Sequence, residues 1–102
     1  MRIVQAYRLA EFAAKHADAG EALNAWAATV RRATWRSLID ARRTYRHADA
    51  VRAASGTVVT VFNIKGNHYR LVAAIDYELQ VVNVLNFLTH AEYDKDNWKK
   101  AL

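Results

Sequence analysis

The chain has 102 residues, with 15 Lys and Arg against 10 Asp and Glu, and contains neither cysteine nor proline. Its length predicts one domain over residues 1–102, and the lack of cysteine excludes disulfides and thiolate metal sites. The net charge of +5 makes a polyanion the first partner to consider.

The excess of positive charge lies in the first half of the chain. Residues 1–53 hold ten basic and five acidic side chains, whereas residues 54–102 hold five of each. The basic half is rich in arginine, whose forked guanidinium matches phosphate and carboxylate groups. We therefore expect the segment 31–46 to contact RNA or an acidic protein surface, with Arg31, Arg32 and Arg36 among the RNA-binding residues. The alternative is a solvated helix face without a partner.

The N-terminal region predicts a short strand followed by helices. Its apolar runs are too short for a signal peptide or a membrane span, so a cytoplasmic protein is expected. Residues 1–4 predict an edge strand. Helical spacing predicts a helix over 6–16, with an apolar face made of Leu9, Phe12 and Ala13.

Two further helices are expected in the basic half. Asp18, with Glu21 three residues later, predicts a capped helix. Its buried face is expected to contain Leu23, Trp26, Ala27 and Val30. Thr34 predicts the cap of a third, short helix, whose inward side chains are expected to be Trp35, Leu38 and Ile39.

After Gly56 the apolar period changes from 3.6 to 2, which indicates strands. The predicted strands are 57–63, 68–77 and 81–89, and the first turn, "KGN", gives Gly66 or Asn67 a positive φ. Trp98 is expected to anchor the polar C-terminal segment. The predicted class is α+β: N-terminal helices packed on a small antiparallel sheet, which consists of a three-stranded C-terminal meander and the short N-terminal strand.

No common catalytic motif is present. The chain lacks a P-loop, GxGxxG, CxxC and HExxH, and the spacing of its four histidines does not suggest a metal site, so neither a metal nor another cofactor is expected. What remains is a set of acid and base groups on a basic protein. RNA supplies its own nucleophile, the 2′-hydroxyl, so this set is sufficient for RNA cleavage.

Four residues are candidates for that chemistry. Histidine exchanges protons near neutral pH, and Tyr93 follows His90 by three residues, so a helical turn would direct both side chains the same way. Arg70 and Lys65 could stabilise the phosphate. Each residue also has a purely structural explanation: His90 as a surface residue at a strand end, Tyr93 as a cover for the sheet edge, Arg70 as a partner of Asp76, and Lys65 as a solvated turn residue.

Several blocks of the sequence resemble one family in the same order. They are "ATWRSLIDARRTY", "NIKGNHYRLV" and "THAEYDK", and together with the segments around them they closely resemble the HigB family of bacterial type II toxins. The resemblance implies a RelE-like fold and cleavage of mRNA in the ribosomal A site. It also implies silencing by a helix-turn-helix antitoxin, HigA, and we expect the free toxin to be a monomer.

The resemblance also assigns residues. The lysine and arginine of the "NIKGN.YRL" block fall on Lys65 and Arg70, and "THAEYDK" brings in His90 and Tyr93. These four are the expected catalytic residues. Further expected RNA contacts are Asn63, Asn67, Lys95 and Lys99.

Leu85 departs from the family pattern, because many members have an arginine at this position of the last strand. This departure keeps a second hypothesis open. The chain could be a non-catalytic module of the same fold that binds an antitoxin or RNA without cleaving it.

Overall fold

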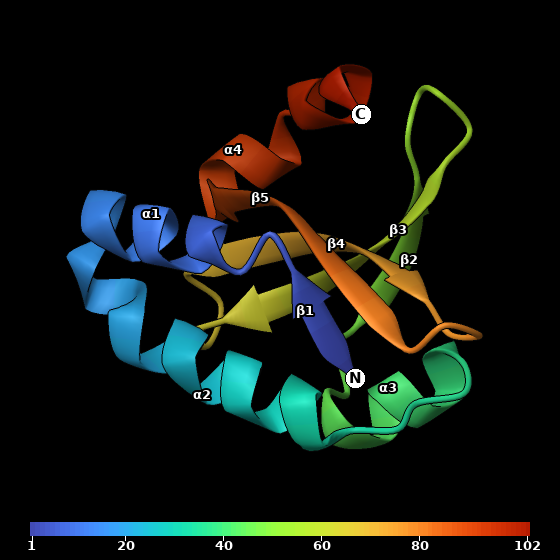
Figure 1. Ribbon diagram of the computed structural model, residues 1–102. Helices are drawn as coiled ribbons and strands as arrows, with labels where there is room; N and C mark the ends of the chain where they lie inside the picture. Colours follow the sequence, from blue (N-terminus) through green and yellow to red (C-terminus); the bar gives the residue numbers. More distant parts are fainter.

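The computed structural model describes residues 1–102 and is built around a five-stranded mixed sheet in the order β1-β5-β4-β3-β2 (Figure 1). The strands are β1 (Arg2–Val4), β2 (Asp49–Arg52), β3 (Val58–Ile64), β4 (Tyr69–Asp76) and β5 (Val81–Thr89). β3, β4 and β5 form an antiparallel meander. The predicted α+β class and the predicted meander are confirmed.

Two strands correct the predicted sheet. β1 is an edge strand, but it runs parallel to β5, with Ile3 opposite Val82. A parallel pair is possible because the helices lie between β1 and β5 in the chain, so no tight hairpin constrains their direction. β2 pairs antiparallel with β3 at the other edge. The sequence pattern does not predict β2, because its four residues, "DAVR", lack the apolar alternation of period two. In the structure only Val51 among them is half-buried.

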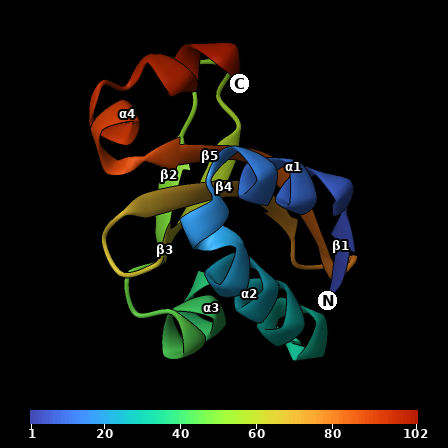
Figure 2. The same ribbon diagram turned by 90° about the vertical axis from the view of Figure 1, so that its left-hand side faces the viewer.

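The helices lie on both sides of the sheet. They are α1 (Tyr7–Lys15), η1 (Ala17–Ala19), α2 (Gly20–Arg32), α3 (Leu38–Thr44), α4 (His90–Asp94) and η2 (Asn97–Ala101). Figure 2 shows the sheet between α2 and α3 below and the C-terminal segment, α4 and η2, above. None of the helices is long and apolar enough to cross a membrane.

Both predicted helix caps are wrong. α2 begins after a 3₁₀ turn with Ala19 at its N-cap, and no side chain caps it. The Asp18 carboxylate accepts instead from the Tyr69 hydroxyl at 2.6 Å. α3 begins at Leu38, four residues after Thr34, and the predicted inward residue Ile39 is 67% exposed. Local spacing could not exclude the first error, because the Tyr69 hydroxyl that Asp18 accepts from comes near only in the folded chain.

Two apolar clusters cover the two faces of the sheet. The larger lies between the sheet and the helices α1, α2 and α3, and Trp26 and Trp35 are buried in it. Their rings pack against Phe62, with centroids at 5.4 and 6.0 Å. The predicted packing role of both tryptophans is confirmed, so neither ring is free to stack on a nucleobase.

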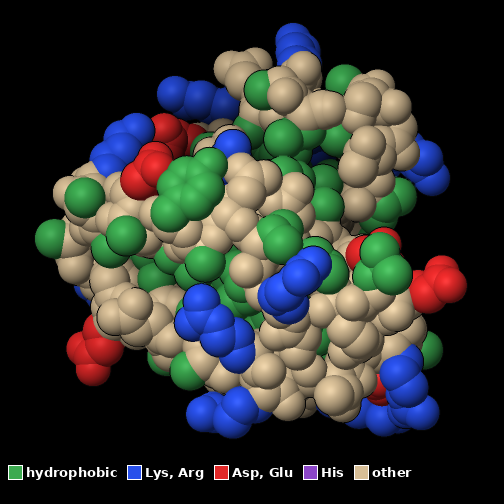
Figure 3. Space-filling model, viewed as in Figure 1, with side chains coloured by type: hydrophobic (Ala, Val, Ile, Leu, Met, Phe, Trp, Pro, Cys, Tyr) green, Lys and Arg blue, Asp and Glu red, His purple; other side chains and the backbone are tan.

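The smaller cluster lies under the C-terminal segment. Trp98, only 5% exposed, packs with apolar side chains from the other face of the sheet: Val59, Val61, Val72 and Leu88. Its indole N–H donates to the Tyr93 carbonyl at 3.0 Å. Figure 3 shows apolar side chains between the C-terminal segment at the top and the sheet below it. The predicted anchoring role of Trp98 is confirmed.

Leu85 is the extra residue of a β-bulge. β4 and β5 change register there: Val72 lies opposite Asn86, but Ala73 lies opposite Val84. The Leu85 side chain is half-buried against the smaller cluster, and its carbonyl accepts from the Arg8 guanidinium at 2.9 Å. Leu85 is therefore an apolar packing residue at a position where the family that the chain resembles typically has a basic side chain.

We predict that Trp98→Ala lowers the free energy of unfolding by about 3–5 kcal/mol, because it removes the largest side chain of the smaller cluster and leaves a cavity. Denaturant unfolding followed by circular dichroism measures the change. Tyr7→Ala is the control, because this ring is 62% exposed and its loss should cost little. Equal stability of the two variants would contradict the anchoring role.

Candidate functional site

The start of β4 and the end of β5 lie side by side and bring distant residues together. Tyr69 pairs with Thr89 and Arg70 with Leu88 in the ladder. Beyond the ladder, the backbone N–H of His90 donates to the His68 carbonyl at 3.0 Å. The β3–β4 hairpin and the first turn of α4 therefore share one edge, and most of the site is built there.

The hairpin turn orients Arg70. The positive φ values fall on Lys65 and Gly66, at 54° and 65°, rather than on Asn67. Asn67 is therefore free to accept from Arg70: its Oδ1 lies 2.6 Å from Nη2 and its carbonyl oxygen 3.3 Å from Nη1. Arg70 does not pair with Asp76. The guanidinium is fixed by the turn that precedes its strand.

His90 contacts three groups. Its Nδ1 lies 3.4 Å from Nη2 of Arg70 and 3.2 Å from the carbonyl oxygen of Asn67. Its Nε2 lies 3.0 Å from Oδ2 of Asp94, one helical turn later. The predicted neighbourhood of His90 and Arg70 is present, and Asp94 is an additional member that the i, i+4 spacing could have indicated.

A capping box fixes the start of α4. The Thr89 hydroxyl accepts from the Glu92 backbone N–H at 3.2 Å, and the Glu92 carboxylate accepts from the Thr89 N–H at 2.9 Å. This backbone hydrogen bond holds the pKa of Glu92 below its usual value. Glu92 is thus occupied in shaping the turn that presents His90 and Tyr93.

Tyr93 lies between Trp98 and Arg70. Its ring stacks on the indole at 5.2 Å, and the Arg70 guanidinium carbon lies 5.6 Å from the ring centroid. Burial raises the pKa of the Tyr93 phenol. A phenol is already protonated at neutral pH with its ordinary pKa of 10.0, so the Tyr93 hydroxyl can donate a hydrogen bond or a proton there but does not act as a base.

A hollow of about 580 Å³ adjoins this edge. It is lined by His47, Asn63, Gly66 and Asn67. Asn63 pairs with Arg70 across the β3–β4 ladder, so both side chains lie on the same face of the sheet. His47 comes from the connection between α3 and β2, and no spacing in the sequence indicates that it would join the hairpin.

Lys65 lies on the other side of the hairpin. Its ammonium group is 3.1 Å from Oδ2 of Asp18, on the helical face of the sheet. The hydrogen bond from Tyr69 and the one from Lys65 hold the pKa of the Asp18 carboxyl below its usual value, and Asp18 in turn raises the pKa of Tyr69. The structure does not bring Lys65 and Arg70 onto one face.

Two of the C-terminal lysines, Lys95 and Lys99, lie near Trp98. Lys95 lines a second hollow, of about 410 Å³, beside Trp98 and Asn86. Lys99 pairs with Asp96 at 3.2 Å and lies 5.8 Å from the Trp98 ring centroid. Lys99 therefore also helps to hold the C-terminal segment.

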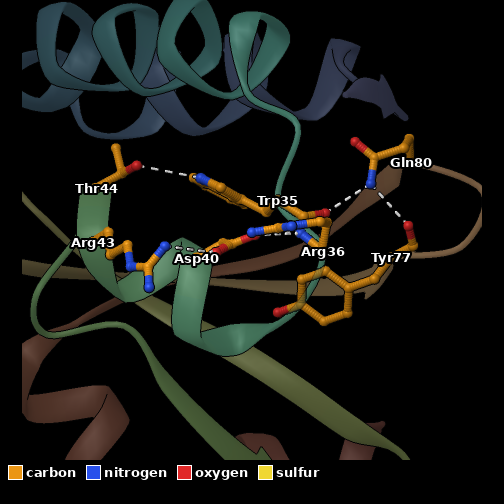
Figure 4. A network of polar contacts seen from close by, with 7 residues as sticks. All are labelled: Trp35, Arg36, Asp40, Arg43, Thr44, Tyr77 and Gln80. Carbon is orange, nitrogen blue, oxygen red and sulfur yellow. Dashed lines mark hydrogen bonds and ion pairs between the residues drawn. The ribbon is translucent and has the colours of Figure 1, made fainter.

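The arginines of the basic half form a separate group on the helical side. Arg36 and Arg43 both pair with Asp40, at 3.0 and 3.4 Å (Figure 4). Arg36 lowers the pKa of Asp40 through this hydrogen bond. Arg32 joins them around an open hollow of about 860 Å³. Figure 3 shows basic side chains along the lower edge of the molecule, where α2 and α3 lie.

Trp35 and Gln80 form another part of the lining of that hollow. The Gln80 side-chain amide donates to the carbonyls of Trp35, at 2.7 Å, and Tyr77, at 2.8 Å (Figure 4). The Trp35 indole donates to the Thr44 hydroxyl at 3.2 Å. Arg31 is exposed on the last turn of α2. The expected RNA-binding arginines thus lie on the sheet face opposite to Arg70 and His90.

One protein family matches this chain. The family model HigB_toxin, described as the RelE-like toxic component of a toxin-antitoxin system, matches residues 19–96. The chain belongs to the HigB toxin family. It is therefore the toxin component of a toxin-antitoxin system, and an antitoxin is its partner. None of the curated proteins compared with the chain matches it.

The match of this HigB toxin to its family includes all of Arg70, His90, Tyr93 and Asp94. No group of three or more histidine and carboxylate side chains is placed to share a metal ion. The groups gathered at the edge are a guanidinium, an imidazole, a phenol, a carboxylate and amides. Together they can bind an anion and move protons.

We predict that Asp18→Asn lowers the stability of the toxin at neutral pH. Because the folded-state pKa of Asp18 lies below its usual 3.8, the stabilisation is present above that value and is lost as pH falls through the folded-state pKa. The difference in unfolding free energy between the variant and the wild type should therefore shrink in acid.

Denaturant unfolding at several pH values between about 3 and 7, a range in which carboxyl groups titrate, measures this difference. Glu11→Gln is the control, since it removes an exposed carboxylate of α1. A deficit of Asp18→Asn that stays constant over this range would show that ionisation of the Asp18 carboxyl does not contribute to the stability.

Proposed function

We propose that this HigB toxin is a metal-independent endoribonuclease that cleaves mRNA on the ribosome, in the A site, and so inhibits translation and growth. The observation that carries the proposal is the contact between Arg70 and His90 at 3.4 Å, beside Tyr93. It joins a fixed positive charge to a group that exchanges protons, which are the two requirements for attack by a 2′-hydroxyl. A ribosomal target implies action in the cytoplasm.

The proposed reaction needs no cofactor. His90 takes the proton of the 2′-hydroxyl, the 2′-oxygen forms a bond to phosphorus, and the bond from phosphorus to the 5′-oxygen breaks. Tyr93 protonates the leaving oxygen, and water restores the phenol. The products are a 2′,3′-cyclic phosphate and a 5′-hydroxyl. Arg70 stabilises the extra negative charge on the phosphate oxygens.

The polar residues around this edge are proposed RNA contacts. Asn63 and Asn67 line the adjacent hollow, where a nucleotide next to the cleaved bond could be held. Lys95 and Lys99 extend positive charge along the C-terminal segment. Lys65 points to the helical face, so a neighbouring phosphate suits it better than the one that is cleaved.

The basic group on the helical side has a different proposed role. Arg31, Arg32 and Arg36 lie on the opposite face of the sheet, so they cannot contact the phosphate that Arg70 binds. They suit phosphates of ribosomal RNA or an acidic surface of the antitoxin. We propose a helix-turn-helix antitoxin of the HigA type as the partner that silences the toxin.

We predict that His90→Ala and Arg70→Ala relieve growth arrest on induction. Loss of a proton-transfer group or of a charge aimed at the transition state costs roughly a hundredfold or more in rate. Mapping of mRNA 5′ ends after induction measures cleavage, and circular dichroism shows that each variant folds. Arg70→Lys should recover little, because an ammonium group cannot replace the fork that contacts Asn67 twice.

His68→Ala is the matched control, because His68 contacts His90 only through its backbone carbonyl. This variant should remain toxic. Wild-type toxicity of the folded His90→Ala and Arg70→Ala variants would disprove the assignment. If the wild type binds RNA or antitoxin without cleavage, the chain is a non-catalytic module, and Leu85 in the bulge of β5 is the feature that favours this second function.

A further inference from the structure

We infer that Asp94 is a positioning residue that makes Nδ1 of His90 the atom that takes up the proton, an inference that rests on the proposed function. Asp94 and His90 lie one helical turn apart in α4, with Oδ2 and Nε2 at 3.0 Å. An ionised carboxylate only accepts hydrogen bonds. Nε2 therefore carries a hydrogen in both the neutral and the charged imidazole.

This contact leaves Nδ1 as the nitrogen whose proton changes. Nδ1 faces one group that only donates, the Arg70 guanidinium at 3.4 Å, and one that only accepts, the Asn67 carbonyl at 3.2 Å. In the neutral ring, the lone pair of Nδ1 accepts from Arg70. In the charged ring, Nδ1 donates to the Asn67 carbonyl. Proton uptake exchanges one partner for the other.

The exchange couples the base to the phosphate site. When Nδ1 gains the proton of the 2′-hydroxyl, it stops accepting from Arg70, and an N–H of that guanidinium becomes available to the phosphate. The Asn67 side chain still holds Arg70 at 2.6 Å during this step. Asn67 thus contacts both partners: its side chain and its carbonyl accept from Arg70, and its carbonyl also faces Nδ1 of His90.

No other carboxylate of the C-terminal segment contacts the ring. Glu92 is held by the capping box, and Asp96 pairs with Lys99. The charged groups that face the imidazole are Arg70 from β4 and Asp94 from α4, and the hairpin contributes one backbone carbonyl, that of Asn67. The Asp94 and His90 side chains are 61% and 43% exposed, so a substitution of Asp94 should leave the fold intact.

Asp94→Asn tests the inference, and Asp96→Asn is its matched control. The control removes the same charge two residues away, at a position with a φ of 61° that asparagine tolerates. Long-range ¹H–¹⁵N spectra of the purified toxin report which ring nitrogen of His90 carries hydrogen, without any need for RNA cleavage. We expect hydrogen on Nε2 in the neutral wild type, and a mixture of both neutral forms in Asp94→Asn.

Cleavage kinetics provide the second readout. In Asp94→Asn, kcat should fall by about fivefold with KM unchanged, because a half-exposed carboxylate makes only a weak pair. Asp94→Glu keeps a carboxylate near Nε2 and should restore the wild-type spectrum and kcat. Asp96→Asn should match the wild type in both readouts.

The outcomes separate the two proposals. If the wild type does not cleave mRNA, the proposed function is wrong, and the spectra still test the role of Asp94. If His90→Ala cleaves mRNA like the wild type, the catalytic role of His90 and the inference about Asp94 are both overturned. If His90→Ala is inactive but Asp94→Asn has the wild-type spectrum and kcat, the role of Asp94 is disproved and the proposed function stands. Equal changes in Asp94→Asn and Asp96→Asn would also overturn the inference, because they would reflect only the loss of negative charge.

Discussion

The packing of Trp98 against the second face of the sheet is the interaction on which the site depends. A five-stranded sheet with apolar side chains on both faces needs two covers, and the N-terminal helices supply only one. The C-terminal segment supplies the other. Because α4 belongs to that segment, the same burial that completes the core holds His90 and Tyr93 beside Arg70. Stability and the proposed chemistry therefore share one set of contacts.

A second constraint is the hairpin turn between β3 and β4. Positive φ at Lys65 and Gly66 turns the chain so that Asn67 faces the start of β4. Asn67 then contacts both Arg70 and His90, which come from different strand ends. A short turn, rather than a long loop, therefore supplies the residue that joins the two halves of the site.

Charge is divided between the two faces of the sheet. The arginine group of α2 and α3 lies on the helical side, with Asp40 between Arg36 and Arg43, whereas Arg70 stands on the other face with His90. A single RNA phosphate cannot bridge them. The division favours two contacts of different kinds: one for the phosphate at the proposed cleavage site, and one for a larger polyanionic surface such as ribosomal RNA or an acidic antitoxin.

The sequence by itself determined the α+β class, the meander, the packing roles of the three tryptophans and the family, because these depend on periodicity and on motifs that lie close together along the chain. It also indicated Arg70, His90 and Tyr93. Only the tertiary structure decided the parallel pairing of β1, the presence of β2, the use of Asp18 by Tyr69 and Lys65, and the entry of His47 into the site. The physical reason is that hydrogen bonds and ion pairs form with whatever the fold brings near, and the partners of Asp18 lie some fifty residues away in the sequence. Local spacing predicts which residues lie on the same face of a helix or strand. The fold decides which groups from other elements contact them.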